Sequence, residues 1–266
     1  MPELPDMSSP SAAQAAPACV LPRPRAVIFD FDSSLVDFHA GDDAAIRRVL
    51  ELSGCGAGFE EFQDHSVSVL YRVYNDGEDY GGNIHRFRLR ETLAHFGHGW
   101  REDYLEAYYG IYLSQVPVFE GAREVLEALR PVVKIGLLTN SLDPWEQGRR
   151  IDASGLRPCF DLIGIAAEMG VWKPDRAAFL WMAERLGCEP RDCVFVGDSE
   201  RHDIEGAKGA GMAAVRKTRD RNAPTLADAV FVTYAELGDI LAGKFAIESG
   251  HADDERDLHE SCPGVR

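Results

Sequence analysis

The sequence predicts an α/β protein with a parallel sheet and helices on both faces of that sheet. Short apolar runs rich in Val, Ile and Leu alternate with helical stretches along the chain, which is typical of a parallel sheet. Between the first two runs lie about 100 residues of a different texture, with helix-spaced apolar residues and Gly-rich breaks. The alternation predicts the sheet, and the intervening segment predicts an all-helical insertion.

The first strand is predicted within Arg25-Ala-Val-Ile-Phe-Asp30-Phe-Asp32, an apolar run that ends in carboxylates. A continuous apolar run of this length is typical of a parallel strand buried on both faces. Further strands are predicted at 132–139, 160–165, 193–197, 213–215 and 229–232, and helices between them near 121–130, 144–154, 175–187 and 202–210.

The insertion is predicted to contain helices near 42–53, 59–75, 83–96 and 103–115, separated by Gly-rich breaks at 54–58, 77–82 and 97–99. The two ends of the chain carry few residues to bury and are expected to be disordered tails. The expected organisation is an N-terminal tail at 1–24, a sheet domain at 25–36 and 116–247, a helical domain at 37–115, and an acidic tail at 248–266.

Composition excludes several classes of protein. Hydrophobic residues make up 45% of the chain and charged residues 27%, as in soluble globular proteins, and no apolar run has the length of a membrane span. The net charge of −16 argues against a nucleic-acid partner, because phosphate backbones bind clusters of Lys and Arg. Six cysteines without a CxxC pair, and a first segment without a secretory pattern, favour the reducing cytoplasm.

Carboxylates follow two of the predicted strands. Ligands of open α/β sheets bind beyond the carboxyl ends of the strands, so polar residues there are candidate site residues. Asp30 and Asp32 would repel each other unless a cation or a proton shared their site. Asp198 ends a third apolar strand and Asp203 follows about one helical turn later. Their hard oxygen atoms are the ligands that Mg²⁺ prefers, so the sequence predicts a metal site.

A hydroxyl and an ammonium group complete the candidate site. Thr139, followed by Asn140, ends another predicted strand, and Lys173 precedes Pro174 in a loop. A hydroxyl, nearby backbone N–H groups and a point charge suit phosphate oxygens. Each residue taken singly has a simpler interpretation as a turn former, a helix cap or a surface charge. Their common position at strand ends and loop mouths favours one shared site.

These motifs resemble those of the haloacid dehalogenase (HAD) superfamily. The first family motif is similar to Asp30-Phe-Asp32-Ser-Ser34, the second to the strand that ends at Thr139, and the third to Lys173-Pro174. The fourth is similar to Gly197-Asp198 through Asp203, continued by Gly206-Ala207 and Ala210-Gly211-Met212. The resemblance covers about residues 25–235.

The resemblance implies a Rossmann-like core with a helical cap inserted after the first motif, and a magnesium-dependent phosphatase. It implies that Asp30 is the nucleophile and that Asp32 is the acid and base. Mg²⁺ would bind Asp30, Asp198 and the backbone carbonyl of Asp32, with Asp203 supporting the metal site. Thr139, Asn140 and Lys173 would bind the phosphoryl oxygens. The implied substrate is a small phosphorylated metabolite, and the implied protein is a monomer or homodimer without nucleic-acid or membrane partners.

Two positions depart from the family pattern. Ser34 stands where the family has Thr or Val, which keeps a hydroxyl and loses a methyl group. Ser33 replaces a common Gly, so the loop is expected to need a backbone angle that a side chain disfavours. These substitutions affect the geometry of the turn more than the chemistry.

The same residues bear on other activities that this fold supports. A 2-haloacid dehalogenase lacks the second carboxylate, so Asp32 argues against that activity, and a phosphonate hydrolase needs a cap Lys that the segment 37–115 does not contain. A sugar phosphomutase shares all four motifs and stays an alternative, as does a silent binding protein on the same fold.

The helical insertion resembles most the subgroup with nucleoside-monophosphate and acylneuraminate-phosphate phosphatases. Arg86 and Arg90 lie one helical turn apart and either face the substrate or are solvated. Trp172, beside Lys173, either lines the site or packs under its loop. These three residues are the candidates for substrate specificity.

Overall fold

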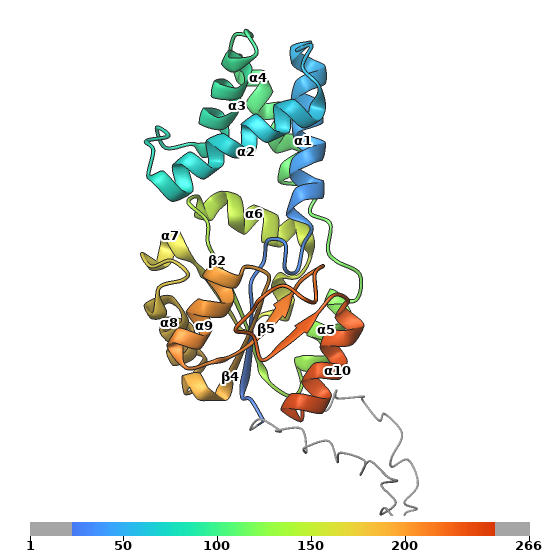
Figure 1. The fold of residues 1–266 in the computed structure, drawn as a ribbon, viewed down its shortest axis with the longest axis vertical. Helices are drawn as coiled ribbons and strands as arrows, with labels where there is room; N and C mark the ends of the chain where they lie inside the picture. The colour runs from blue at the N-terminus through green and yellow to red at the C-terminus, as the bar shows by residue number, and fades with distance from the viewer. Residues whose placement is uncertain (1–22, 248–266) are drawn as a thin grey trace, which may run out of the picture.

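The computed structural model describes residues 23–247, so the predicted tails at 1–24 and 248–266 lie outside the described residues except for residues 23 and 24. A sheet domain and a helical domain make up the described part (Figure 1). None of its helices combines the length and the hydrophobicity that a membrane span requires.

The described strands form one parallel sheet in the order β3-β2-β1-β4-β5-β6. The strands are β1 (Ala26–Phe29), β2 (Lys134–Thr139), β3 (Leu162–Ile165), β4 (Cys193–Gly197), β5 (Ala213–Lys217) and β6 (Ala229–Phe231). The strand order reverses at β1, which lies between β2 and β4. The carboxyl ends of these three strands are therefore neighbours, and a switch point of this kind is where open sheets bind ligands.

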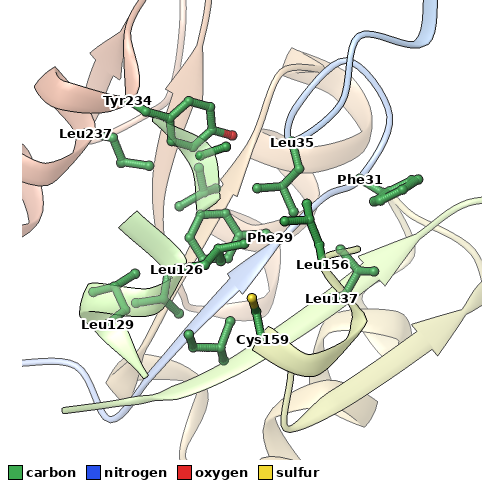
Figure 2. Packing of buried hydrophobic residues seen from close by; sticks show 14 of the residues in the cluster. Phe29, Phe31, Leu35, Leu126, Leu129, Leu137, Leu156, Cys159, Tyr234 and Leu237 are labelled. Atoms are coloured by element: carbon green, nitrogen blue, oxygen red, sulfur yellow. The ribbon is translucent and has the colours of Figure 1, made fainter. Parts of the chain in front are cut away.

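Helices cover both faces of the sheet. They are α5 (Ala122–Leu129), α6 (Pro144–Ser154), α7 (Ala166–Met169), α8 (Arg176–Leu186), α9 (Gly206–Ala210) and α10 (Tyr234–Phe245). Short 3-10 turns lie at Arg157–Cys159 and Pro190–Asp192, and a π-helical turn at Glu200–Glu205 precedes α9. Alternate side chains of β1 enter different clusters: Phe29 packs with residues of α5 and α10, and Ile28 with residues of α8 and α9. Figure 2 shows Phe29 among side chains of the first cluster.

The residues at the two ends of α6 explain where this helix begins and ends. Asp143 accepts a hydrogen bond from the backbone N–H of Glu146 at 3.1 Å, and Pro144 occupies the first helical turn. Both features are favoured at helix starts. Gly155 ends the helix with a left-handed φ of 68°, which a residue without a side chain adopts at little cost. Local sequence thus sets the length of α6, the helix that carries Gln147 and Arg150.

The helical domain lies between β1 and β2 in the chain and contains α1 (Phe38–Ser53), α2 (Phe59–Asp76), α3 (Ile84–His95) and α4 (Glu102–Tyr112). A separate apolar cluster holds it together, with Ile46, Leu89 and Tyr108 among its fully buried members. The four predicted cap helices are confirmed, and left-handed glycines 54, 77 and 97 mark the three predicted breaks. In this article the cap denotes α1 to α4.

The sheet and its parallel topology agree with the sequence prediction, with three differences among the helices. The short helix α7, Ala166–Met169, was not predicted. The stretch predicted as helix at 202–210 contains the π-helical turn before α9. The sequence analysis did not predict α10, the helix Tyr234–Phe245. Gly238 and Gly243 lower the helix propensity of that segment, and burial of Leu237, Leu241 and Phe245 against the sheet overrides it.

A buried ion pair lies inside the cap. Arg88 is fully buried, and its Nη2 lies 2.6 Å from Oδ1 of Asp42. Asp42 also accepts hydrogen bonds from the hydroxyl of Tyr108 at 2.6 Å and from Nε2 of Gln63 at 2.9 Å. Burial opposes the charge of Asp42, but Arg88 and these donors hold the pKa of that carboxyl well below its usual range. The pair is therefore charged at neutral pH.

We expect Asp42→Ala to lower the free energy of unfolding by about 3–5 kcal/mol, because it leaves the Arg88 charge buried without its partner. Chemical denaturation of the variant and the wild-type protein measures this difference. Glu51→Ala is the control, since it removes an exposed ion pair with Arg48 and should change stability by less than about 1 kcal/mol. Equal stability of the two variants would contradict a structural role for the buried pair.

Candidate active site

The candidate site lies at the carboxyl ends of β2, β1 and β4. Thr139 is the last residue of β2, Asp30 follows β1, and Asp198 follows β4. The backbone N–H of Asp30 donates to the carbonyl of Val196 at 2.9 Å, which continues the pairing of β1 with β4 as far as Asp30. Parallel strands end at one edge of the sheet, so three residues far apart in sequence meet there.

Three carboxylates and one ammonium group form the centre of the site. Oxygen atoms of Asp30, Asp198 and Asp203 lie within 4.8 Å of one another. Nζ of Lys173 lies 2.6 Å from Oδ1 of Asp30 and 2.7 Å from Oδ1 of Asp203. Lys173, Asp30 and Asp203 are buried, and Asp198 is half-buried. The structure thus brings together the residues that the first, third and fourth motifs supply.

The electrostatics of this cluster favour an additional cation. Burial raises the pKa of Asp30 well above its usual value, Lys173 opposes that shift, and Asp203 and Asp198 add to it. Burial and the neighbouring Asp203 raise the pKa of Asp198 to about 6. Three carboxylates therefore share one buried ammonium group. A hard divalent ion would reduce their mutual repulsion, and carboxylate oxygens are the ligands it prefers.

Asp203 orients the other members of the cluster. Its Oδ2 accepts hydrogen bonds from the backbone N–H groups of Asp198 at 3.1 Å and Ser199 at 2.9 Å, while Oδ1 accepts from Lys173. Gly197 makes this contact possible, because a Cβ atom there would lie 2.5 Å from the Asp203 carboxyl carbon. Both oxygens of Asp203 are thus in use, which suits the supporting role that the sequence assigned to it.

The loop that carries Lys173 is held by the residue after β2. Nδ2 of Asn140 donates to the backbone carbonyl of Lys173 at 2.8 Å, and the backbone N–H of Lys173 donates to Oδ1 of Asn140 at 2.9 Å. This pair of hydrogen bonds fixes the Lys173 backbone relative to β2. Trp172, next in the same loop, is half-buried. Asn140 therefore acts through its side chain on Lys173, in addition to any contact with substrate.

The second carboxylate of the first motif is held by α6. Nε2 of Gln147 lies 2.9 Å from Oδ2 of Asp32 and 2.9 Å from Oγ1 of Thr139. Nη2 of Arg150 lies 2.7 Å from Oδ1 of Asp32. Neither Gln147 nor Arg150 is among the site residues predicted from the sequence. The only signal was their position on the helix after the second motif, where a polar stretch is usually solvated.

The two serines of the first motif have distinct roles. Ser33 has a left-handed φ of 61°, which confirms the unusual backbone angle expected where the family has Gly. Its carbonyl accepts a hydrogen bond from Nζ of Lys217 at 3.0 Å, which stabilises the turn. Ser34 is fully buried, and its hydroxyl lies 3.2 Å from Oδ1 of Asp198. The hydroxyl kept at Ser34 thus orients a carboxylate of the cluster.

The cap contacts the core beside this site. Nε2 of His85 on α3 lies 2.9 Å from Oε1 of Glu146 on α6, and the hydroxyl of Tyr109 on α4 donates to Oε2 at 3.1 Å. Burial opposes the charge of Glu146, but His85 and Tyr109 lower the pKa of that carboxyl. The sequence did not predict a role for His85, Tyr109 or Glu146. Their contacts join the cap to the core, and a local sequence pattern gives no sign of contacts between two domains.

The three candidates for substrate specificity are placed differently from one another. Arg86 is half exposed and pairs with Glu102 at 3.2 Å, and Arg90 lies 3.6 Å from Glu91. Among the described residues neither arginine forms a hydrogen bond or ion pair with the cluster of Asp30, Asp198, Asp203 and Lys173. Trp172 adjoins Lys173 in its loop. The role of the two arginines in recognition stays a prediction of the sequence.

Comparisons with known proteins agree with this geometry. The profile of the haloacid dehalogenase-like hydrolases matches residues 24–211. Pyrimidine 5'-nucleotidase YjjG of Escherichia coli (strain K12) is 40% identical over 190 residues, which cover 70% of this chain and 83% of that protein. N-acylneuraminate-9-phosphatase of Homo sapiens is 29% identical over 206 residues, covering 73% of this chain and 82% of that protein.

Among solved structures, the HAD-hydrolase YfnB of Bacillus subtilis bound to magnesium is similar with a TM-score of 0.70 and 22% identity, covering 82% of this chain and 99% of that chain. At that identity the likeness concerns the fold, a parallel-sheet core with a helical cap. The resemblance inferred from the four motifs is confirmed, because the matching profile covers most of the chain. The chain belongs to the haloacid dehalogenase-like hydrolase family and is an enzyme of that family.

Proposed function

We propose that this enzyme is a magnesium-dependent phosphomonoesterase that hydrolyses small phosphorylated metabolites through a phosphorylated Asp30. The observation that carries the proposal is the contact of Asp30 with Lys173 beside Asp198 and Asp203 at the strand ends. The relatives named above, which are a nucleotidase and a phosphatase, support the same class of reaction.

Mg²⁺ fits the donor set of this site. Asp30 and Asp198 supply carboxylate oxygens within 4.8 Å of each other, and the resemblance adds the backbone carbonyl of Asp32. Asp203 would support the ion indirectly, because its oxygens already accept hydrogen bonds. A bound ion would neutralise negative charge on the carboxylates and on the phosphoryl group.

The chain's own residues account for both halves of the reaction. In the first, an oxygen of Asp30 attacks phosphorus, the ester P–O bond breaks, and Asp32 gives a proton to the leaving oxygen. In the second, Asp32 takes a proton from water as the water oxygen attacks phosphorus. The bond between phosphorus and Asp30 breaks, and inorganic phosphate leaves. Lys173, Thr139 and the backbone of Asn140 bind the phosphoryl oxygens in both steps.

Two features of the surface around the site bear on the substrate: a groove, and an exposed indole ring that would suit a planar group. A groove of about 1130 Å³ reaches Ser33 and Asp198, and its walls include Lys217 and Arg219. At the start of α6, Trp145 is 61% exposed, and its ring meets the ring of Tyr109 edge to face at 6.4 Å between centroids. An exposed indole ring beside a catalytic site is suited to stacking on a nucleobase.

Location and assembly stay proposals. The cysteines of the described residues, Cys55, Cys159, Cys188 and Cys193, are free thiols, which favours the cytoplasm. A monomer or homodimer is proposed. A nucleic-acid partner is not expected, because the chain carries a net charge of −16.

A screen of phosphorylated metabolites with Mg²⁺, with released phosphate as the readout, tests this proposal. The panel should contain nucleoside monophosphates, sugar phosphates, acylneuraminate phosphate and p-nitrophenyl phosphate. We expect phosphate release from at least one natural ester and from the aryl ester. Isomerisation of a sugar phosphate without phosphate release would favour a phosphomutase. Binding without any reaction would favour a silent binding protein.

A further inference from the structure

Helix α6 holds both carboxylate oxygens of Asp32. Nη2 of Arg150 lies 2.7 Å from Oδ1, and Nε2 of Gln147 donates to Oδ2 at 2.9 Å. Nη1 of Arg150 also donates to Oε1 of Gln147 at 3.3 Å. The three side chains therefore form a closed ring of polar contacts. The position of the Asp32 carboxylate depends on α6, and not only on the loop after β1.

Arg150 is a buried cation, with 2% of its surface exposed. Burial opposes its charge, but Asp32 raises the pKa of the guanidinium above its ordinary value. Among the described residues Asp32 is the only carboxylate that forms an ion pair with Arg150. A buried ion pair contributes little net stability compared with apolar packing, so stability alone is a weak explanation for this arginine.

The guanidinium group also lies at the base of the cap, where the chain enters and leaves it. Its carbon atom is 4.5 Å from the ring centroid of Tyr112 and 5.4 Å from that of Phe38. Phe38 is the first residue of α1 and Tyr112 the last residue of α4, so these rings mark the two points where the chain enters and leaves the cap. The two rings meet edge to face at 6.1 Å between centroids. Arg150 thus contacts both ends of the cap and Asp32.

Gln147 extends the same contacts to the phosphoryl-binding residues. Its Nε2 donates to Oγ1 of Thr139 at 2.9 Å as well as to Asp32. Gln147 and Thr139 are both buried, so water does not compete for these hydrogen bonds. The side-chain amide of Gln147 therefore bridges the Asp32 carboxylate and the end of β2. Arg150 holds that amide by donating to its Oε1 atom.

We propose that Arg150 is a positioning residue, which places the carboxylate of Asp32 for proton transfer and ties that placement to the base of the cap. The inference rests on the proposed function, in which Asp32 transfers the proton. Arg150 does not touch the substrate. It acts through Asp32, so its loss should matter most where protonation of the leaving oxygen limits the rate.

The test compares Arg150→Met and Arg150→Lys with Arg149→Met, which changes an exposed arginine on the same helix. For an alkyl phosphate, which needs a proton on its leaving oxygen, we expect kcat of Arg150→Met to fall by about 100-fold with KM changed by less than about threefold. With p-nitrophenyl phosphate, whose leaving group needs no proton, the burst of nitrophenol should keep its amplitude and slow by less than about fivefold. Arg149→Met should match the wild-type protein.

Arg150→Lys keeps the cation and loses the planar contact with the two rings, so it should restore part of the alkyl phosphatase activity. It also keeps the test decisive if Arg150→Met does not fold. An equal slowing of the phosphoryl-transfer step, measured in single turnover, on both substrates would overturn the proposal, as would no loss of kcat on the alkyl ester.

A double-mutant cycle separates positioning from a general structural role. In an Asp32→Asn background, Arg150→Met should change the single-turnover rate of phosphoryl transfer from the alkyl phosphate by less than about twofold, because the group through which Arg150 acts is already gone. A full additional loss would refute action through Asp32. If the wild-type protein releases no phosphate from any ester, the proposed function fails. If it is active and Arg150→Met slows phosphoryl transfer from the two substrates alike, only the role of Arg150 fails.

Discussion

Asp30→Asn is expected to lower phosphate release by at least about 10⁴-fold while leaving the protein folded, because an amide cannot attack phosphorus. Folding should survive, since Lys173 keeps its contact with Asp203 at 2.7 Å. Burial raises the pKa of Asp30, so removing its charge also relieves an unfavourable desolvation. Initial rates of phosphate release and thermal unfolding of the same samples measure both effects.

Asp32→Asn is the matched comparison, because it removes the acid and base and keeps the nucleophile. With p-nitrophenyl phosphate it should give a burst of nitrophenol and then stall, leaving phosphate bound to the protein. Asp30→Asn should give no burst. Near-normal turnover by Asp30→Asn would show that another residue is the nucleophile.

Removal of divalent metal is expected to lower turnover by at least about 100-fold, and Mg²⁺ should restore it. The cause is the excess negative charge of the cluster, in which burial and Asp203 raise the pKa of Asp198 to about 6. A phosphoryl dianion would add to this repulsion. Activity in excess chelator, followed by titration with Mg²⁺, measures the effect.

A second readout does not depend on activity. Mg²⁺ should raise the unfolding temperature of the wild-type protein, because an ion that binds the folded state stabilises it by about 2.7 kcal/mol at 100 times its dissociation constant. Asp198→Asn should lose most of this shift, since it removes a ligand. Glu51→Ala, at an exposed ion pair with Arg48, is the control and should keep the shift. Full activity in chelator together with no thermal shift would contradict the metal site.

The polar residues at the strand ends could be predicted because each one directly follows an apolar run in the sequence. Apolar runs that stop at Asp30, Thr139 and Gly197 predict strands, and the rule that parallel strands end at one edge of a sheet brings the next polar residues together. The structure confirms the strands, places carboxylate oxygens of Asp30 and Asp198 within 4.8 Å of each other, and places Nζ of Lys173 2.6 Å from Asp30. The left-handed φ of Ser33 was predictable for the same reason, since one residue type in one turn carries the information.

By itself the sequence determined the family, the parallel sheet, the helical insertion and the acidic residues that meet at the strand ends, because short-range periodicity and fixed spacings encode them. Only the tertiary structure decided the partners of Asp32. Gln147 is 115 residues from Asp32 in the chain, and its helix reads as polar and solvated. The same holds for Arg88 and Asp42 in the cap, 46 residues apart. Charge pairing in a buried site depends on distance in space and on exclusion of water, and neither quantity is written in a local pattern of residues.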